Sequence, residues 1–101
     1  MIVVTLKKEN DVVNEITIIG HAEYEDTGKD IVCASVSSIV LTTVNAIMRI
    51  NRDAIDYIEN DGVWIKILKS TVVTDKLIDN LIDLLLELEK QYSKYIEIRR
   101  C

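Results

Sequence analysis

The sequence predicts an α+β fold with two layers, in which a mostly antiparallel sheet carries two helices on one face. Short runs rich in β-branched residues recur along the chain, and two longer segments repeat apolar residues at helical spacing. The 101 residues include no proline and only three glycines, which favours long regular elements. We expect the order ββ-α-ββ-α-β in a single domain that spans residues 1–101, a length that can bury one core.

The first two runs predict a hairpin. Residues 2–6 are short and β-branched, and residues 7–11 have the composition of a turn. In residues 12–19 the side chains alternate, with Ile16 and Ile18 facing one way and polar residues facing the other. Alternation of this kind is typical of strands with one buried face.

The first helix is expected to begin at Asp30, whose carboxylate is a good N-cap, so that Cys33 lies in the first turn. Apolar positions then repeat at helical spacing. They are Val36, Ile39, Val40, Thr43, Val44 and Ile47. Because Val, Ile and Thr have weaker helix propensity, a strand over residues 38–44 is the alternative. The length of the segment without a turn signal favours a helix.

The second half of the chain predicts another hairpin. Residues 54–59 and 63–69 flank Asn60-Asp61-Gly62, and Asp-Gly between β-branched runs is a strong hairpin signal. Val63, Ile65 and Ile67 are expected to face the core, and Trp64 and Lys66 the other side.

The clearest helix starts at Thr74 or Asp75 and ends near Tyr92. Its apolar residues step by three and four. They are Ile78, Leu81, Leu85, Leu88 and Tyr92. Residues 95–99 alternate and are expected to form the last strand.

Charge and composition restrict the partners. Twelve basic and seventeen acidic residues give a net charge of −5, which argues against direct nucleic-acid binding because that needs clustered Lys and Arg. Residues 31–50 are about as long as a membrane span. They include Ser35, Asn45 and Arg49, however, so a buried helix is expected rather than a membrane partner. Two cysteines and no visible secretory signal favour the reducing cytosol.

The chemistry is expected at His21, the only histidine, and Cys33. A polar loop over residues 21–29, with Gly28 near its end, separates them. A base and a helix start would together favour a reactive thiolate. The alternatives are that Cys33 is a small buried apolar residue and that His21 is a surface residue after Gly20. Neither cysteine has a zinc-ligand spacing with His21, so no metal is expected.

Two motif blocks are specific. Gly20-His21-Ala22 precedes a glycine-bearing loop and then Asp30-Ile31-Val32-Cys33-Ala34-Ser35-Val36-Ser37. This pattern resembles the ribosomal-processing cysteine protease family, called Prp or YsxB-like. The resemblance implies a cytosolic endopeptidase, commonly dimeric, that trims the N-terminal extension of large-subunit ribosomal protein twenty-seven. It makes His21 the catalytic histidine and Cys33 the nucleophile. Asp30 and Ser37 match further motif positions. Ser35 departs slightly from the family pattern, in which many members have another small residue at this position.

The expected mechanism needs no cofactor. His21 takes the thiol proton, Cys33 attacks the scissile carbonyl, and amides of residues 32–34 hold the oxyanion. Asp30 either orients His21 or only caps the helix. Ser37 either contacts the substrate or bonds the backbone four residues back. Gly20 and Gly28 are expected to support the site.

Other features leave alternatives open. Residues 23–26, three of which are acidic, either receive a basic peptide or are simply a solvated loop. The class alternative is a non-catalytic ribosome-assembly module that binds the same ribosomal protein. A thiol-dependent acyl carrier has no support beyond Cys33. The helix over residues 74–92 is a candidate homodimer face under either main hypothesis.

Overall fold

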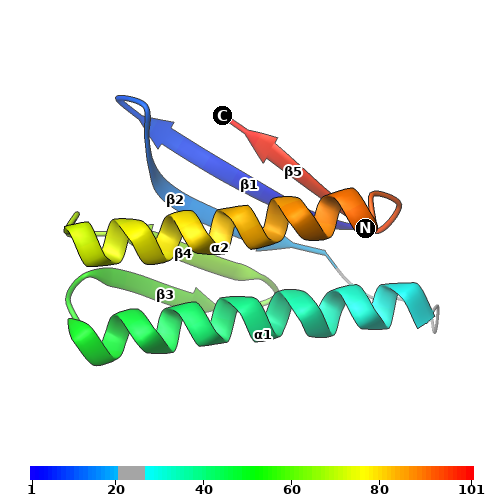
Figure 1. Cartoon of the computed structure of the whole chain (residues 1–101), viewed down its shortest axis with the longest axis horizontal. Coiled ribbons are helices and arrows are strands. Elements are labelled where there is room, and N and C mark those ends of the chain that lie inside the picture. The colour runs from blue at the N-terminus through cyan, green and yellow to red at the C-terminus, as the bar shows by residue number, and fades with distance from the viewer. Residues whose placement is uncertain (21–26) are drawn as a thin grey trace.

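The structure, a computed structural model, describes the backbone of residues 1–20 and 27–101 and the side chains of residues 1–20 and 31–101. Five strands and two helices follow in the predicted order (Figure 1). They are β1 (Ile2–Glu9), β2 (Val12–Ile19), α1 (Thr27–Ile50), β3 (Ile55–Glu59), β4 (Val63–Ile67), α2 (Val72–Gln91) and β5 (Ile96–Arg100). The predicted fold class is therefore confirmed.

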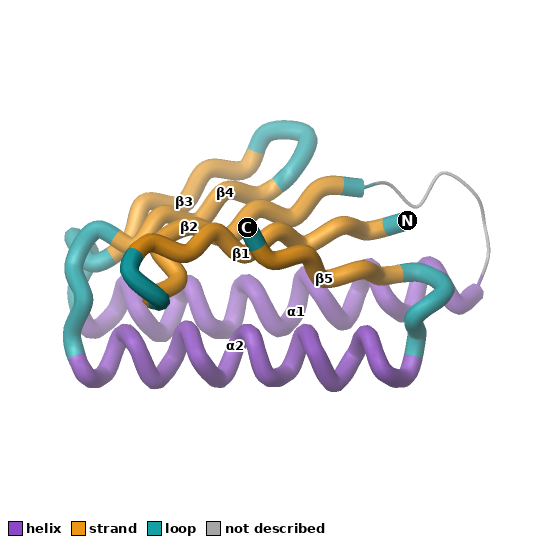
Figure 2. The backbone as a smooth tube through the Cα atoms, turned by 90° about the horizontal axis from the view of Figure 1, so that it is seen from above, coloured by secondary structure: helices purple, strands orange, loops and turns teal. Residues whose placement is uncertain are grey.

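One sheet contains all five strands, in the order β3-β4-β2-β1-β5. Its pairs are antiparallel except β1 with β5, which are parallel. Both helices lie on the same face of this sheet (Figure 2), with α1 on the β3 side and α2 on the β5 side. The other face carries no helix in the described part of the chain. An antiparallel sheet can face water on one side in this way.

The first hairpin is longer than the sequence predicts. Residues 7–11 were expected to form a turn, but Lys7 and Lys8 continue β1, and only Asn10 and Asp11 connect the strands. Both turn residues have positive φ, 53° and 63°, as a two-residue hairpin turn requires. Asn and Asp tolerate this backbone better than other non-glycine residues, which explains why the turn can be so short.

Helix α1 begins at Thr27, three residues before the predicted start. Asp30 therefore lies inside the helix, and its prediction as N-cap is wrong. Cys33 becomes the seventh helical residue instead of a first-turn residue. The strand alternative over residues 38–44 is also wrong, because the helix continues unbroken to Ile50. Weak local propensity is overridden here by the continuous apolar face that packs on the sheet.

The inner face of α1 belongs to the hydrophobic core. Its buried residues are Val32, Val36, Val40, Thr43, Val44 and Ile47. By length and composition alone, one helix among the described residues, Ile31–Ile50, is apolar enough to cross a membrane. The apolar composition of this helix is explained within the fold, because one side of α1 is buried against the sheet.

The second hairpin and the second helix follow the sequence closely. Ile65 is buried and Lys66 exposed, as the alternation predicts, and Asp61 has a φ of 55° in the turn. Helix α2 begins at Val72 rather than at Thr74 or Asp75, because Thr71 is the N-cap and its Oγ1 accepts from the Thr74 amide at 3.2 Å. Four residues of the predicted apolar stripe are buried, Ile78, Leu81, Leu85 and Leu88, whereas Tyr92 is the half-buried C-cap.

Candidate active site

A cavity of about 330 Å³ lies between the N-terminal half of α1 and the sheet, at the end of the sheet where the β3–β4 turn is found. It is open to solvent on one side. Its lining comes from the ends of β1 and β2, from β3, from the β3–β4 turn and from α1. The residues are Ile2, Ile18, Gly20, Cys33, Val36, Ser37, Val40, Leu41, Tyr57, Glu59, Asp61, Gly62 and Val63.

Cys33 stands on the helical wall of this cavity. Its side chain is half-buried and packs against the core, whereas Cys101 is exposed at the chain end, and both thiols are free. Cys33, Ser37 and Leu41 are spaced by four residues, so they form one stripe along α1 that faces the cavity. Cys33 thus packs against the core, as the alternative interpretation expects, but it is only half-buried and also lines an open cavity. A substrate can reach this sulfur.

Ser37 lies one turn beyond Cys33 and is exposed. One alternative for Ser37 was a hydrogen bond to the backbone four residues back. Ser35 makes a bond of this kind, from its hydroxyl to the Ile31 carbonyl at 2.8 Å. Ser37 lines the cavity one helical turn from Cys33.

The early start of α1 changes the expected oxyanion site. In an α-helix only the first four N–H groups have no intrahelical acceptor. Because α1 begins at Thr27, the amides of residues 32–34 lie beyond these four and donate within the helix. The prediction that those three amides hold an oxyanion is therefore wrong. The positive end of the helix dipole still points toward the Cys33 end of the molecule, about one turn further from the sulfur.

The opposite wall of the cavity carries acidic and aromatic groups. Tyr57 Oη donates to Glu59 Oε2 at 3.0 Å, and Asp61 follows in the turn. Burial, this hydrogen bond and the Glu59 charge all raise the pKa of Tyr57 above its ordinary value of 10.0. The tyrosine therefore stays a neutral donor that holds the carboxylate in place. The two charged residues of the described lining, Glu59 and Asp61, are both acidic.

Sequence reasoning missed this second wall. Tyr57 and Glu59 were recognised as part of a hairpin, but not as neighbours of Cys33. Their position depends on β4 pairing with β2, where Ile16 is opposite Ile65 and Ile18 is opposite Val63. A pairing between segments so far apart in sequence leaves no local signal.

Gly20 directly follows β2, lines the cavity and has a φ of 144°, a backbone that L side chains rarely adopt. A Cβ built here would lie 2.3 Å from the Met1 carbonyl oxygen, so only glycine allows the two backbones to approach this closely. The next residue, His21, lies outside the described residues, as do the side chain of Asp30 and the loop residues 22–26. The backbone of Gly28 is helical, in the first turn of α1.

The fold and the cavity describe a small α+β protein with an accessible thiol opposite an acidic wall, an arrangement that a thiol-dependent hydrolase can use. The family comparison agrees with this class. The family model of cysteine protease Prp matches residues 1–97, and the chain belongs to this family. It is therefore a cysteine protease. No curated protein matches the sequence significantly.

Solved structures share the fold over the whole chain. An essential ribosomal processing protease Prp from S. aureus, in complex with a substrate peptide, is 23% identical with a TM-score of 0.91 and full coverage of both chains. The same protease with a covalently linked product peptide is 24% identical, with a TM-score of 0.88 and full coverage of both. SMU.848 from Streptococcus mutans is 19% identical with a TM-score of 0.87, covering 99% of this chain and 93% of that one.

Proposed function

We propose that this chain is the endopeptidase that removes the N-terminal extension of large-subunit ribosomal protein twenty-seven during bacterial ribosome maturation. The observation that carries the proposal is the position of Cys33 on the wall of an open cavity, in a chain of the cysteine protease Prp family. The ribosomal substrate is supported by the S. aureus structures of the same fold, which are described as a ribosomal processing protease.

In the proposed mechanism Cys33 is the nucleophile and His21 the base. His21 accepts the Sγ proton, and the sulfur attacks the scissile carbonyl carbon. The C–N bond then breaks, and the imidazolium protonates the leaving amine. Water, deprotonated by His21, hydrolyses the thioester that remains and releases the thiol. Gly20 supports this assignment, because it lines the same cavity as Cys33 and directly precedes His21 in the chain. No cofactor is needed for these steps.

Four further residues are proposed to support the dyad. Ser37 contacts the substrate beside Cys33, since it is exposed within the cavity lining. Asp30 orients His21, because Asp30 lies inside α1 and so does not cap the helix. Gly20 allows the tight approach of β2 to β1, and Gly28 supports the first turn of α1 before the nucleophile.

We also propose that the protein works in the cytoplasm, where ribosomes are assembled, as a homodimer. Two features support the homodimer. Leu84, with 42% of its area exposed, lies with Ile39 along a shallow groove between α1 and α2. Val72 and Val73 add exposed apolar area at the start of α2. Light scattering at two concentrations, with Leu84→Glu as the variant, tests this arrangement: the wild type should have twice the monomer mass.

The proposed function is tested by incubating the purified chain with the full-length ribosomal precursor and measuring product mass. Cleavage should be lost in Cys33→Ser and retained in Cys101→Ser, which is the matched control because Cys101 is exposed and distant in sequence. A wild-type chain that binds the precursor without cutting it would instead support a ribosome-assembly module.

A further inference from the structure

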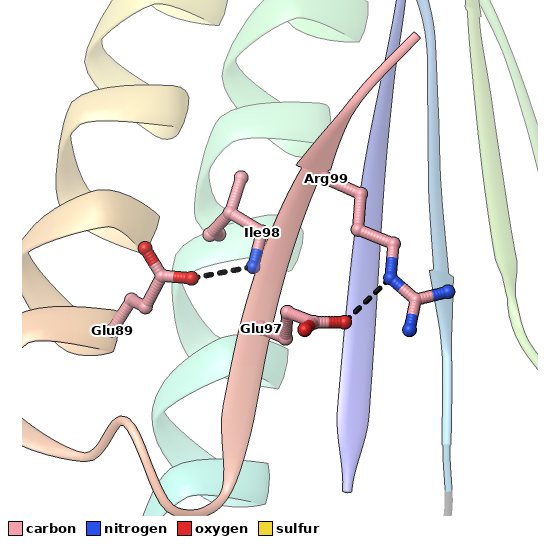
Figure 3. A network of polar contacts seen from close by, with 4 residues as sticks. All are labelled: Glu89, Glu97, Ile98 and Arg99. Atoms are coloured by element: carbon pink, nitrogen blue, oxygen red, sulfur yellow. Dashed lines mark hydrogen bonds and ion pairs between the residues drawn. The ribbon is translucent and has the colours of Figure 1, made fainter.

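The two edge strands of the sheet differ in how their outer backbone groups are satisfied. At β5 the Ile98 amide points away from β1 and donates to Glu89 Oε2 of α2 at 2.6 Å (Figure 3). Glu97 and Arg99 form an ion pair on the same strand. A carboxylate on the outer amide prevents another strand from pairing there, which is a common way to protect an edge.

At β3 the outer backbone groups belong to the odd-numbered residues. Leu68 N donates to Ala54 O at 2.8 Å, and Asn60 N donates to Gly62 O at 3.0 Å. Hydrogen-bonded pairs alternate along an antiparallel ladder, so the even-numbered residues of β3 face β4. The main-chain groups of Ile55, Tyr57 and Glu59 therefore point outward. Within the described part of the chain, no strand lies on that side of β3.

This outer edge of β3 is continuous with the cavity of Cys33. Tyr57 and Glu59 supply both the outward backbone groups and side chains of the cavity lining. Across the cavity, the stripe of α1 runs from Cys33 through Ser37 to Leu41, which is 46% exposed. Eight helical residues span about 12 Å, the length of about three or four residues of an extended peptide. An extended segment of about three or four residues can therefore lie along this stripe, between Cys33 and Leu41.

The charge of this groove favours one kind of peptide. Glu59 and Asp61 are exposed carboxylates of the cavity lining, and Tyr57 holds one of them through its hydroxyl. Ile18, Val36 and Val40 form a buried apolar floor beneath them. Such a groove suits an extended segment that combines an apolar side chain with a basic one, since a basic group gains attraction from both acids.

We propose that the substrate peptide adds to the free edge of β3 as an extra strand, while its scissile bond lies at Cys33. Its backbone pairs with the outward groups of Tyr57 and Glu59, and a basic side chain lies near Glu59 and Asp61. This inference rests on the proposed function, because it concerns the substrate of the same site. The blocked edge of β5 provides an internal comparison.

The first test is an N-methyl scan of a synthetic peptide that carries the extension and its cleavage site. Methylation at one residue removes one backbone donor. Because only every second residue of an added strand donates to its neighbour, kcat/KM should fall about tenfold at alternate positions and little at those between. Uniform effects along the peptide, or none outside the scissile bond, would overturn the docking proposal and leave proteolysis standing.

The second test is amide hydrogen exchange of Cys33→Ala with and without the unmodified peptide. The peptide should slow exchange at Tyr57 and Glu59 and leave Ile98 of the blocked edge unchanged, which is the matched control. Protection of the β3 amides that rises with protein concentration in the absence of peptide would assign this edge to a second copy of the chain and overturn the proposal. Peptide protection without wild-type cleavage would refute only the proposed function. A chain that neither cleaves nor binds the peptide refutes both.

Discussion

The backbone at Gly20 gives the most direct test of the local structure, through Gly20→Ala. The new Cβ would lie 2.3 Å from the Met1 carbonyl oxygen and 2.8 Å from Ile2 Cα, both main-chain atoms that cannot rotate away. A non-glycine residue at a φ of 144° adds strain of about 1–3 kcal/mol. Relief of the contact would separate the end of β2 from the start of β1 and weaken a hydrogen bond there, at about 1 kcal/mol.

We therefore expect Gly20→Ala to lower the free energy of unfolding by about 2–4 kcal/mol, measured by urea denaturation. The matched control is Gly62→Ala. Its Cβ would lie 3.1 Å from the Ile18 carbonyl oxygen and 3.2 Å from the Trp64 ring, and its φ is not in the glycine-favouring region. Gly62→Ala should cost clearly less. Equal losses in the two variants, or a loss at Gly20 below about 0.5 kcal/mol, would refute the reasoning.

Three further predictions concern other parts of the fold. Glu89→Ala should lower the free energy of unfolding by about 1–2 kcal/mol and increase self-association measured by light scattering. Glu89→Gln keeps an acceptor for Ile98 N, so it should lower stability less and increase association less. Identical results for the two variants would contradict the proposal that Glu89 protects the β5 edge. Because the pKa of Tyr57 is raised above 10.0, folding opposes its ionisation, so stability should be intact below pH 10 and fall as pH rises beyond it. Denaturant titrations on either side of pH 10 should show a shallower decline in Tyr57→Phe, and equal slopes would argue against this. Leu81→Ala, at a fully buried position, should lower the free energy of unfolding by about 2–5 kcal/mol. Leu84 is 42% exposed, so Leu84→Ala should cost under about 1 kcal/mol when both variants are measured at a concentration at which the chain is monomeric. Similar losses under that condition would mean that α2 packs with another face.

Amphipathic elements were the part of this fold that the sequence could predict well. The stripe of α2 repeats Ile78, Leu81, Leu85 and Leu88 on one side, and the structure buries all four. The alternation in β2 likewise places Ile16 and Ile18 in the core. In both cases the local periodicity of apolar residues predicts which side chains are buried, so no long-range information is needed.

Element boundaries depended on backbone details that the local pattern does not contain. Asp30 has the side chain of a good cap, yet α1 begins earlier, at Thr27, so the residue type alone did not identify the helix start. The same applies to Thr74, which lies within α2 while Thr71 caps it. The observed start of α1 places Cys33 in the second helical turn instead of the first. The amides that were expected to hold the oxyanion therefore donate within the helix.

Only the wall of the cavity that carries Gly20 and Cys33 could be predicted from the sequence. The motif blocks around Gly20 and Cys33 are local, and the cavity brings these two residues together. The opposing wall of Tyr57 and Glu59 arises from the order β3-β4-β2, and the parallel pairing of β5 with β1 is equally non-local. Neither arrangement follows from the composition of any single segment.

Selective alkylation is the most direct measurement of the central claim, which is that Cys33 is the activated nucleophile of this chain. Intact protein is treated with iodoacetamide near neutral pH, and modification is followed at each cysteine by peptide mass spectrometry. Cys33 should react faster than Cys101 although it is less exposed, and His21→Ala should slow Cys33 alone. If the exposed Cys101 reacts faster in the wild type and His21→Ala changes neither rate, the catalytic account of this cavity is contradicted.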